Sequence, residues 1–328
     1  MLAGVLMATV GCGPGGAAAT PTIPTSPAAP TAPASSASSA APASPATRAP
    51  AAAAASTTAT VLAVGDIADC GSRGDDESAA ITARLLKAAP RATILTLGDH
   101  AYPDGSTRAF RDCYQPSWGK FTPRVRPVPG NHDYGTRNAA GYFAYFGKAA
   151  GPRGKGYYSF NLGAWHVVAL NSNCDEVGGC GPSSPQGRWL RADLAIHRST
   201  CTLAYWHHPR FSSGEHGSDR DVSGFWSVLQ AARADVVLGG HDHDYERFAP
   251  QGADGRAAAT GIREFVVGTG GADQRDFAGR EHNSQRRITG TDAVLQLRLT
   301  RAGYRWSLVG PGATSRPLDS GSGTCSKR

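Results

Sequence analysis

The chain has 328 residues, of which 40% are hydrophobic, and its formal net charge is +7. The positive residues are mostly scattered arginines, with no basic run or aromatic-rich basic patch, so a specific nucleic-acid-binding function is not favoured. Without its first sixty or so residues, which could not build a core, the chain has the length of one large domain.

The N-terminal segments predict export and a linker. Residues 1–12 are apolar, end in Gly11-Cys12 and resemble the tail of a bacterial lipoprotein signal, but they are too short to span a membrane as a helix. Two interpretations stay open, a lipid on Cys12 or plain secretion, and they predict a cell-surface-anchored or an extracellular protein. Residues 13–59 are almost entirely Ala, Pro, Ser and Thr, which bury too little apolar surface to fold and predict a disordered linker.

An α/β pattern begins at residue 60 and extends to residue 312. The apolar runs Val61–Val64 and Ile94–Leu97 predict strands, and residues 75–89 between them predict a helix. That helix begins with acidic residues, which suit the positive end of its dipole, and a proline follows its end. Val125–Val128 is a weaker strand candidate.

A second strand–helix–strand unit follows. It runs from Trp165–Leu170 through a helix over residues 186–194 to Leu203–Tyr205, and Val236–Leu238 is a further apolar run. We expect residues 313–328 to form a C-terminal tail. The β-rich stretches that should complete a second sheet are Glu264–Val267, Ala293–Leu299 and Tyr304–Leu308.

Five short motifs close to the ends of predicted strands contain metal-ligand residue types. Ligands collect at the carboxyl ends of strands in open α/β sheets, so these motifs should converge on one crevice. Carboxylate and amide oxygens are hard ligands, imidazole is borderline and a phenolate favours a hard trivalent ion, so the mixture suits Fe(III) beside divalent Zn, Mn or Fe. The motifs are Gly65-Asp66, Gly98-Asp99-His100-Ala101-Tyr102, Gly130-Asn131-His132-Asp133, Trp206-His207-His208-Pro209 and Gly240-His241-Asp242-His243.

These residue types point to phosphoester chemistry. Two ions about 3.5–4 Å apart can clamp a phosphate ester, and one can lower the pKa of a bound water towards roughly 7. Asp99, in the central motif, is the best candidate for a bridging carboxylate. His132 and His216 are free imidazoles suited to binding phosphate oxygens or protonating a leaving alkoxide. Asp133 either orients His132 or caps a turn, and Asp242 should point away from the metals.

From about Val61 to Gly310, the ordered motifs resemble the calcineurin-like metallophosphoesterases, and Tyr102 with His241-x-His243 resembles the purple acid phosphatases among them. The resemblance implies a two-sheet αββα sandwich with a dinuclear site at the carboxyl ends of the strands. It implies an Fe(III) site formed by Asp66, Asp99, Tyr102 and His243. It implies a second site for Fe, Zn or Mn formed by Asp99, Asn131, His207 and His241.

Two positions depart from the family pattern. The family usually has Asp-x-Gly in its first motif, whereas this chain has Ala68 in place of the glycine, so we expect a shifted loop with the site retained. In the fourth motif two histidines are adjacent, and the His-x-Pro spacing favours His207 over His208 as the ligand.

The sequence therefore predicts an exported dinuclear metallophosphatase that hydrolyses phosphomonoesters by attack of a metal-bound hydroxide. A phosphodiesterase or nucleotidase using the same site is the nearest alternative, and a non-catalytic cell-surface binding protein is the alternative of another class. The expected partner is a small phosphate ester, with no specific nucleic acid and with membrane contact only through a lipid on Cys12.

The cysteines fit an oxidising compartment. Six of the seven lie after Cys12 and could form three disulfides, for which fifteen pairings exist. Cys174 and Cys180 would close a short loop, and Cys201 with Cys325 would fasten the tail. Cys70 and Cys113 each follow a metal motif, and unpaired buried thiols are the alternative for the whole set.

Overall fold

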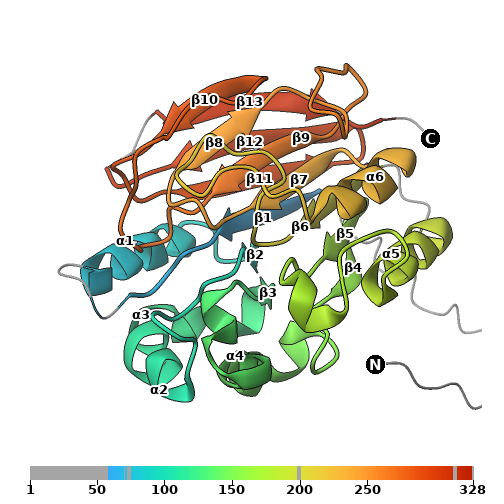
Figure 1. The fold of residues 1–328 in the computed structure, drawn as a ribbon. Helices are drawn as coiled ribbons and strands as arrows, with labels where there is room; N and C mark the ends of the chain where they lie inside the picture. The colour runs from blue at the N-terminus through green and yellow to red at the C-terminus, as the bar shows by residue number, and fades with distance from the viewer. Residues whose placement is uncertain (1–57, 70, 72–74, 198–200, 313–315, 327–328) are drawn as a thin grey trace, which may run out of the picture. The chain divides into compact units, whose positions relative to one another are not determined.

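The computed structural model describes residues 58–69, 71, 75–197, 201–312 and 316–326. Residues 1–12 with Cys12, and nearly all of the predicted linker over residues 13–59, lie outside the described residues. No helix in the described part of the chain is long and apolar enough to cross a membrane. The described strands form two sheets with helices packed beside them (Figure 1).

The first sheet has six strands and contains the first two predicted strands. β1, β2 and β3 are parallel, whereas β11 pairs antiparallel with β1 and continues into two further antiparallel strands. The order across the sheet is β13 (Asp319–Thr324), β12 (Gly303–Val309), β11 (Val294–Thr300), β1 (Ala59–Val64), β2 (Thr93–Thr96) and β3 (Val125–Pro127).

The second sheet has seven strands. Its centre is parallel, because β5, β6, β7 and β9 all pair in the same direction, and antiparallel strands complete both edges. The order across the sheet is β10 (Ser284–Ile288), β8 (Tyr245–Phe248), β9 (Arg263–Val267), β7 (Val236–Gly239), β6 (Cys201–Tyr205), β5 (Trp165–Ala169) and β4 (Tyr158–Leu162).

The helices are mostly short and lie outside the sheets. Beside the α-helices there are one π-helical segment, η1, and several 3₁₀ segments. The α-helices are α1 (Asp75–Lys87), α2 (Thr107–Ala109), α3 (Gln115–Trp118), α4 (Ala140–Phe146), α5 (Pro185–Ile196) and α6 (Ser223–Ala231). The other segments are η1 (Phe110–Tyr114), η2 (Gly119–Arg124), η3 (His132–Gly135), η4 (Arg137–Ala139), η5 (Gly147–Ala150) and η6 (Cys174–Val177).

Two apolar clusters hold these layers together. The larger one joins residues of both sheets, such as Val61 and Val236, with Ala83 of α1 and the aromatic residues of the α2–α4 region. The smaller one packs α5 and α6 on the other face of the seven-stranded sheet, through residues such as Leu190 and Trp226. This arrangement confirms the predicted α/β sandwich of two sheets with helices on the outer faces.

The prediction for the C-terminal strands was partly wrong. Glu264–Val267 does lie in the second sheet as β9, but the two later stretches form β11 and β12 of the first sheet, because β11 pairs with β1. Within the predicted tail, Asp319–Thr324 forms β13, so the first sheet extends beyond the expected domain end at residue 312.

Disulfides close a loop and fasten the chain end. Cys174 pairs with Cys180, and Cys201 at the start of β6 pairs with Cys325 just after β13. Both pairs match the predicted ones. Cys113 is also disulfide-bonded, and Cys70 lies outside the described residues.

Candidate metal centre

The predicted ligands follow the carboxyl ends of parallel strands in both sheets, so two sheets contribute to one site. Asp66 follows β1, Asp99 follows β2 and His241 follows β7, and all three have left-handed backbones with φ of 60°, 48° and 71°. This conformation costs about 1–3 kcal/mol in a residue other than glycine and concentrates at functional sites. The chain therefore bends sharply at the points where these side chains turn towards one another.

Tyr102 is at the centre of the first group of predicted ligands. Its hydroxyl lies 3.2 Å from Asp66 Oδ1, 3.2 Å from Asp99 Oδ2 and 3.1 Å from His243 Nε2. The other ring nitrogen of His243, Nδ1, donates to the carbonyl of Asp273 at 2.7 Å, which leaves Nε2 as an acceptor. One phenolic proton thus faces three acceptors, and a cation would satisfy all of them together.

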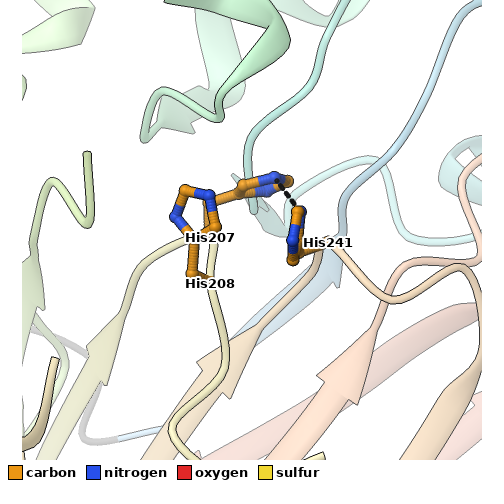
Figure 2. A group of neighbouring side chains, drawn as sticks. All are labelled: His207, His208 and His241. Carbon is orange, nitrogen blue, oxygen red and sulfur yellow. Dashed lines mark hydrogen bonds between the residues drawn. The ribbon is translucent and has the colours of Figure 1, made fainter. Parts of the chain in front are cut away.

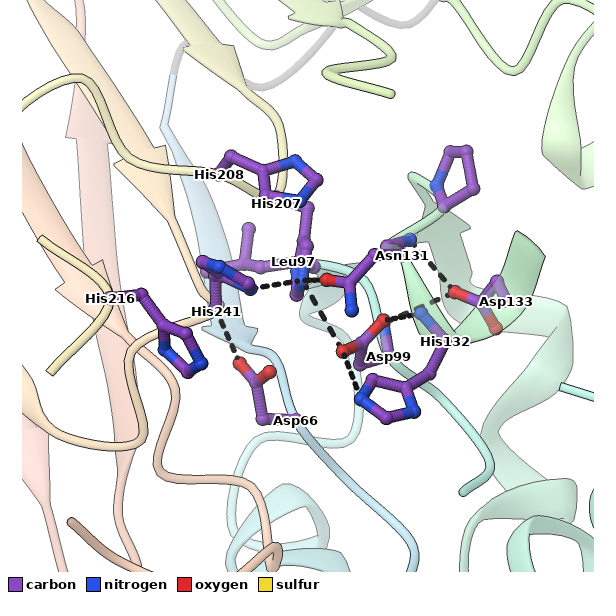
Figure 3. Close-up of polar contacts among 12 residues, drawn as sticks. Asp66, Leu97, Asp99, Asn131, His132, Asp133, His207, His208, His216 and His241 are labelled. Atoms are coloured by element: carbon purple, nitrogen blue, oxygen red, sulfur yellow. Dashed lines mark hydrogen bonds and ion pairs between the residues drawn. The ribbon is translucent and has the colours of Figure 1, made fainter. Parts of the chain in front are cut away.

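The second group of predicted ligands shares Asp99 with the first, and Figure 3 shows its other members, Asn131, His207 and His241, near Asp99. His207 Nδ1 donates to the carbonyl of Leu97 at 2.8 Å, so Nε2 faces inward. That nitrogen lies 3.0 Å from Asn131 Oδ1, 3.4 Å from Asp99 Oδ2 and 3.2 Å from His241 Nδ1. These are the four residues predicted for the second ion, and their facing atoms are again nearly all acceptors.

The charges of this buried cluster also favour cations. Burial raises the pKa of Asp66 to about 8, and the charge of Asp99 adds to that effect. Burial opposes ionisation of Asp99 as well, but the charge and hydrogen bond of His207 hold the pKa of Asp99 below its usual range. Burial would lower the pKa of His207, yet the charge of Asp99 raises it to about 9. In the ion-free protein, Asp66 and His207 therefore hold protons, and bound metal ions would replace those protons.

Glycines beside the ligands allow close packing. A Cβ at Gly130 would collide with the Asp99 carboxylate, and one at Gly98 would collide with the His207 ring. A Cβ at Gly268 would lie 2.9 Å from Asp66 Oδ2, so the Gly268–Gly271 loop approaches the site closely. Ala68, which stands where the family usually has glycine, is buried and forms an isolated parallel β-bridge with Ala101.

The two candidate acid–base histidines lie on either side of the predicted ligands. The His132 ring lies tilted against the Tyr102 ring with centroids 4.4 Å apart, and His132 Nδ1 donates to the carbonyl of Pro103 at 2.6 Å. His216 lies against His241 with ring centroids 4.2 Å apart. About a third or more of each side chain is exposed, 39% for His132 and 34% for His216, so both can reach a substrate.

The carboxylate that orients a candidate histidine is Asp242. Its Oδ1 accepts from the backbone N–H of His216 at 2.8 Å and from His216 Nδ1 at 3.1 Å, so it points away from the metal ligands as predicted. Asp133 does not contact the His132 ring. Its buried carboxylate accepts from the backbone N–H groups of Asp99 and Gly130. Of the two roles left open for Asp133, these contacts favour the one in which it fixes the turns that carry the candidate ligands.

Sequence reasoning did not anticipate three further features. His100 is buried and binds Asp133 at 2.9 Å, so it supports the loop of Asp99 from behind. His208 lies beside His207 and His241 (Figure 2) but is directed by Ser172 Oγ, 2.8 Å from its Nδ1. Arg275, from the loop between β9 and β10, has Nη1 3.1 Å from His216 Nε2. No motif marks it in the sequence.

A cavity of about 430 Å³ opens beside the second group. Asn131 and His208 form the part nearest the predicted ligands. The remaining walls include four acidic residues and several polar ones, namely Tyr134, Ser172, Asn173, Cys174, Asp175, Glu176, Asp219 and Asp221. This cavity is large enough for the alcohol part of a small ester.

A separate group of His166, Asp193 and His197 is not a second metal site. Asp193 lies 2.7 Å from His166 Nε2 and 3.0 Å from His197 Nδ1. The two imidazoles are stacked, with an interplanar angle of 15° and centroids 4.4 Å apart. A ligand imidazole holds its metal in the ring plane, and two stacked planes cannot share one ion. The group is a hydrogen-bond network that joins α5 to β5.

Comparison with known proteins agrees with this geometry. The family model described as calcineurin-like phosphoesterase matches residues 59–245, more than half of the chain. Purple acid phosphatase 22 of Arabidopsis thaliana is 29% identical over 232 residues, which are 63% of this chain and 50% of that protein. The chain thus spans half or less of the length of the curated relatives it matches.

Solved structures show the same fold. Purple acid phosphatase PPD1 from yellow lupin (Lupinus luteus) seeds aligns with a TM-score of 0.62 at 17% identity, over 82% of this chain and 54% of that one. GAP50, described as the anchor in the inner membrane complex of Plasmodium, aligns with a TM-score of 0.63 at 14% identity, over 83% of this chain and 90% of that one. At such identities the likeness concerns the fold alone.

Proposed function

The chain belongs to the calcineurin-like phosphoesterase family, and on that premise we propose that it hydrolyses phosphomonoesters at a dinuclear metal centre. The observation that supports this most strongly is the position of the Tyr102 hydroxyl, within 3.2 Å of Asp66, Asp99 and His243. A tyrosine at the junction of these ligands also supports the closer likeness to purple acid phosphatases. We infer Fe(III) in this group.

The second ion would be held by the group that shares Asp99 with the first. Asn131, His207 and His241 offer one amide oxygen and two imidazole nitrogens, a mixed set of hard and borderline ligands that can hold Zn, Mn or Fe. When bound, two such ions would polarise the phosphate and lower the pKa of a water molecule, which is the chemistry that hydrolysis of a phosphate ester needs.

The flanking histidines would act on the substrate itself. His132 keeps its proton on Nδ1 because of the Pro103 carbonyl, so Nε2 is the atom that meets a phosphate or ester oxygen. His216 is held by Asp242 in the same way, with Nε2 directed outward. The ester would therefore lie between these two rings, above the metal ligands, with its alcohol part in the neighbouring cavity.

Two alternatives remain, one with a different ester as substrate and one without catalysis. A phosphodiesterase or nucleotidase would use the same metal ligands and differ in the residues at the rim of the substrate pocket. A non-catalytic binding protein is the other candidate, because a fold neighbour is described as an anchor rather than as an enzyme. The complete ligand set favours turnover here, since a binding surface needs no such cluster. Export, with or without a lipid on Cys12, stays part of the proposal, and the disulfides support it.

Replacement of the shared carboxylate tests the proposal. Purified full-length protein should release phosphate from a monoester faster than it cleaves a diester with the same leaving group. Asp99→Asn removes the one carboxylate common to both groups, so bound metal and turnover should fall together. His132→Ala should keep both ions and lose about 10²–10⁴-fold in rate, the usual scale for acid–base assistance. Two ions and a near-normal rate in Asp99→Asn would refute the dinuclear mechanism.

A further inference from the structure

Arg275 brings a permanent positive charge to the edge of the candidate metal centre. Its Nη1 lies 3.1 Å from His216 Nε2 and 3.3 Å from Glu215 Oε2. A guanidinium has donors only and stays protonated at every pH at which proteins function. His216 Nε2 is therefore the acceptor of this hydrogen bond, and its lone pair is occupied while Arg275 is in place.

The backbone of Arg275 is fixed to the candidate metal centre. Its N–H donates to the carbonyl of His243 at 3.2 Å, and its carbonyl accepts from Thr289 Oγ1 at 2.6 Å. Two residues earlier, the carbonyl of Asp273 accepts from His243 Nδ1 at 2.7 Å. The segment from Asp273 to Arg275 is thus hydrogen-bonded twice to His243, a candidate ligand. These hydrogen bonds hold the backbone of Arg275 close to the candidate metal centre.

The ion pair between Arg275 and Glu215 is exposed, so another anion can replace Glu215. The side chain of Arg275 is 38% exposed and that of Glu215 is 61% exposed. Water screens an ion pair this exposed, and such a pair contributes little stability. An anion that arrives between the two flanking histidines can therefore take the place of Glu215 without a large loss.

We propose that Arg275 binds a non-bridging oxygen of the substrate phosphate and makes the centre select phosphomonoesters over phosphodiesters. The inference rests on the proposed function and deepens it. A monoester near neutral pH has three non-bridging oxygens and close to two negative charges, whereas a diester has two such oxygens and one charge. The planar guanidinium pairs best with an oxyanion of high charge.

Binding of the substrate by Arg275 also changes His216. When the guanidinium turns from His216 Nε2 to the phosphate, that nitrogen becomes available to the ester. Substrates without a free phosphate dianion would leave the hydrogen bond between Arg275 and His216 in place. Arg275 would then favour monoesters over diesters in kcat as well as in binding affinity.

Arg275→Gln tests the proposal in steady-state kinetics with p-nitrophenyl phosphate and bis(p-nitrophenyl) phosphate, which share a leaving group. We expect kcat/KM for the monoester to fall about 10- to 100-fold, the usual scale for one hydrogen bond to a charged group. The diester should lose about threefold or less. Arg275→Lys should recover part of the monoester rate, because it keeps the charge and loses the planar fork.

The matched control is Arg111→Gln, which removes an exposed arginine that pairs with Asp112 at 2.7 Å in another part of the chain. It should change neither rate. Metal content and thermal unfolding of each variant would show that the fold and both ions are retained. An equal loss on both esters, or an unchanged ratio between them, would overturn the selectivity assigned to Arg275.

Binding measurements separate failure of this inference from failure of the proposed function. By calorimetry on the metal-loaded protein, Arg275→Gln should weaken orthophosphate binding about 10- to 100-fold and dimethyl phosphate binding little. A wild type that binds orthophosphate and cleaves neither ester would refute the hydrolase and keep the role of Arg275 in binding. Equal affinities of wild type and variant for orthophosphate would refute that role.

Discussion

At the scale of single residues, Tyr102 links the metal centre to a spectroscopic property. Burial, with the charges of Asp99 and Asp66, raises the pKa of the Tyr102 hydroxyl well above its ordinary value, so a phenolate forms there only with a strong cation beside it. Fe(III) is such a cation, and a bound phenolate gives a visible charge-transfer band that Zn or Mn would not give.

We predict that protein loaded with iron under oxidising conditions absorbs visible light. Tyr102→Phe should lose the band and keep much of its iron, because Asp66, Asp99 and His243 remain. Absorption spectra paired with elemental analysis test this. A colourless wild type that contains iron would show that Tyr102 packs near the ions without binding them.

The protonation of the ligands predicts a pH-dependent metal uptake. With a pKa of about 8 for Asp66 and about 9 for His207, both groups hold a proton at pH 7 in the ion-free protein. Binding needs the carboxylate and the neutral imidazole, so loading with Zn²⁺ at pH 7 should release about two protons per chain. Affinity should rise, and proton release should fall, as the pH passes through about 8 and 9.

Calorimetric titration in buffers of different ionisation enthalpy measures this release at each pH. Proton release that stays constant from pH 7 to pH 10 would contradict the raised pKa values of Asp66 and His207, and with them the view that protons substitute for metal ions in the ion-free centre.

At the scale of elements, buried carboxylates on the second sheet hold the loop that carries His216. Glu246 of β8 accepts from the Ser213 N–H at 2.7 Å and from Ser213 Oγ at 2.6 Å. Glu264 of β9 accepts from the N–H groups of Arg210 and Phe211 at 2.9 and 3.0 Å. The loop after β6 is therefore fixed by strands that carry no metal ligand.

Glu246→Gln should loosen this loop, because an amide places an N–H group against one of the two Ser213 donors. We expect the free energy of unfolding to fall by about 1–3 kcal/mol. The value of kcat for a monoester should also fall, with both ions retained, since His216 lies close to Ser213 in the chain. Denaturant unfolding, kcat and metal content measure the three effects.

Glu264→Gln is the matched control for Glu246→Gln. Glu264→Gln loosens the start of the same loop, which is farther along the chain from His216. It should lower the free energy of unfolding by a similar amount and lower kcat less than Glu246→Gln does. Loss of metal from Glu246→Gln, or wild-type stability in both variants, would contradict this account of the loop.

For the whole molecule, the features predictable from the sequence were those encoded locally. The segments that became β1, β2, β6 and β7 contain short, continuous apolar runs, and each is followed by a ligand residue type. The α1 helix was similarly predictable from its acidic start and the proline after its end. Because parallel strand ends converge, these local signals were enough to place the ligands in one centre.

Features that depend on tertiary pairing were not predictable. The run that became β11 reads equally well as a strand of either sheet, and only its pairing with β1 decides between them. β13 consists of Asp, Ser, Gly and Thr, residues mostly unfavourable in strands, and exists because β12 offers it an edge. The position of Arg275 beside His216, and the hydrogen-bond partners of Asp133 and Asp242, depend on contacts between loops that are distant in the sequence. No spacing of residues in the sequence reveals such contacts.

The central claim is that turnover of a phosphomonoester requires two ions in the groups that share Asp99. The most direct test is to titrate metal-free, full-length protein with Fe(III) and Zn²⁺ and to measure phosphate release against the metal bound per chain. The account predicts negligible release with one ion and a rate that rises to its maximum as the second ion binds. Full activity in metal-free protein, or a rate that reaches its maximum with one ion per chain, would contradict it.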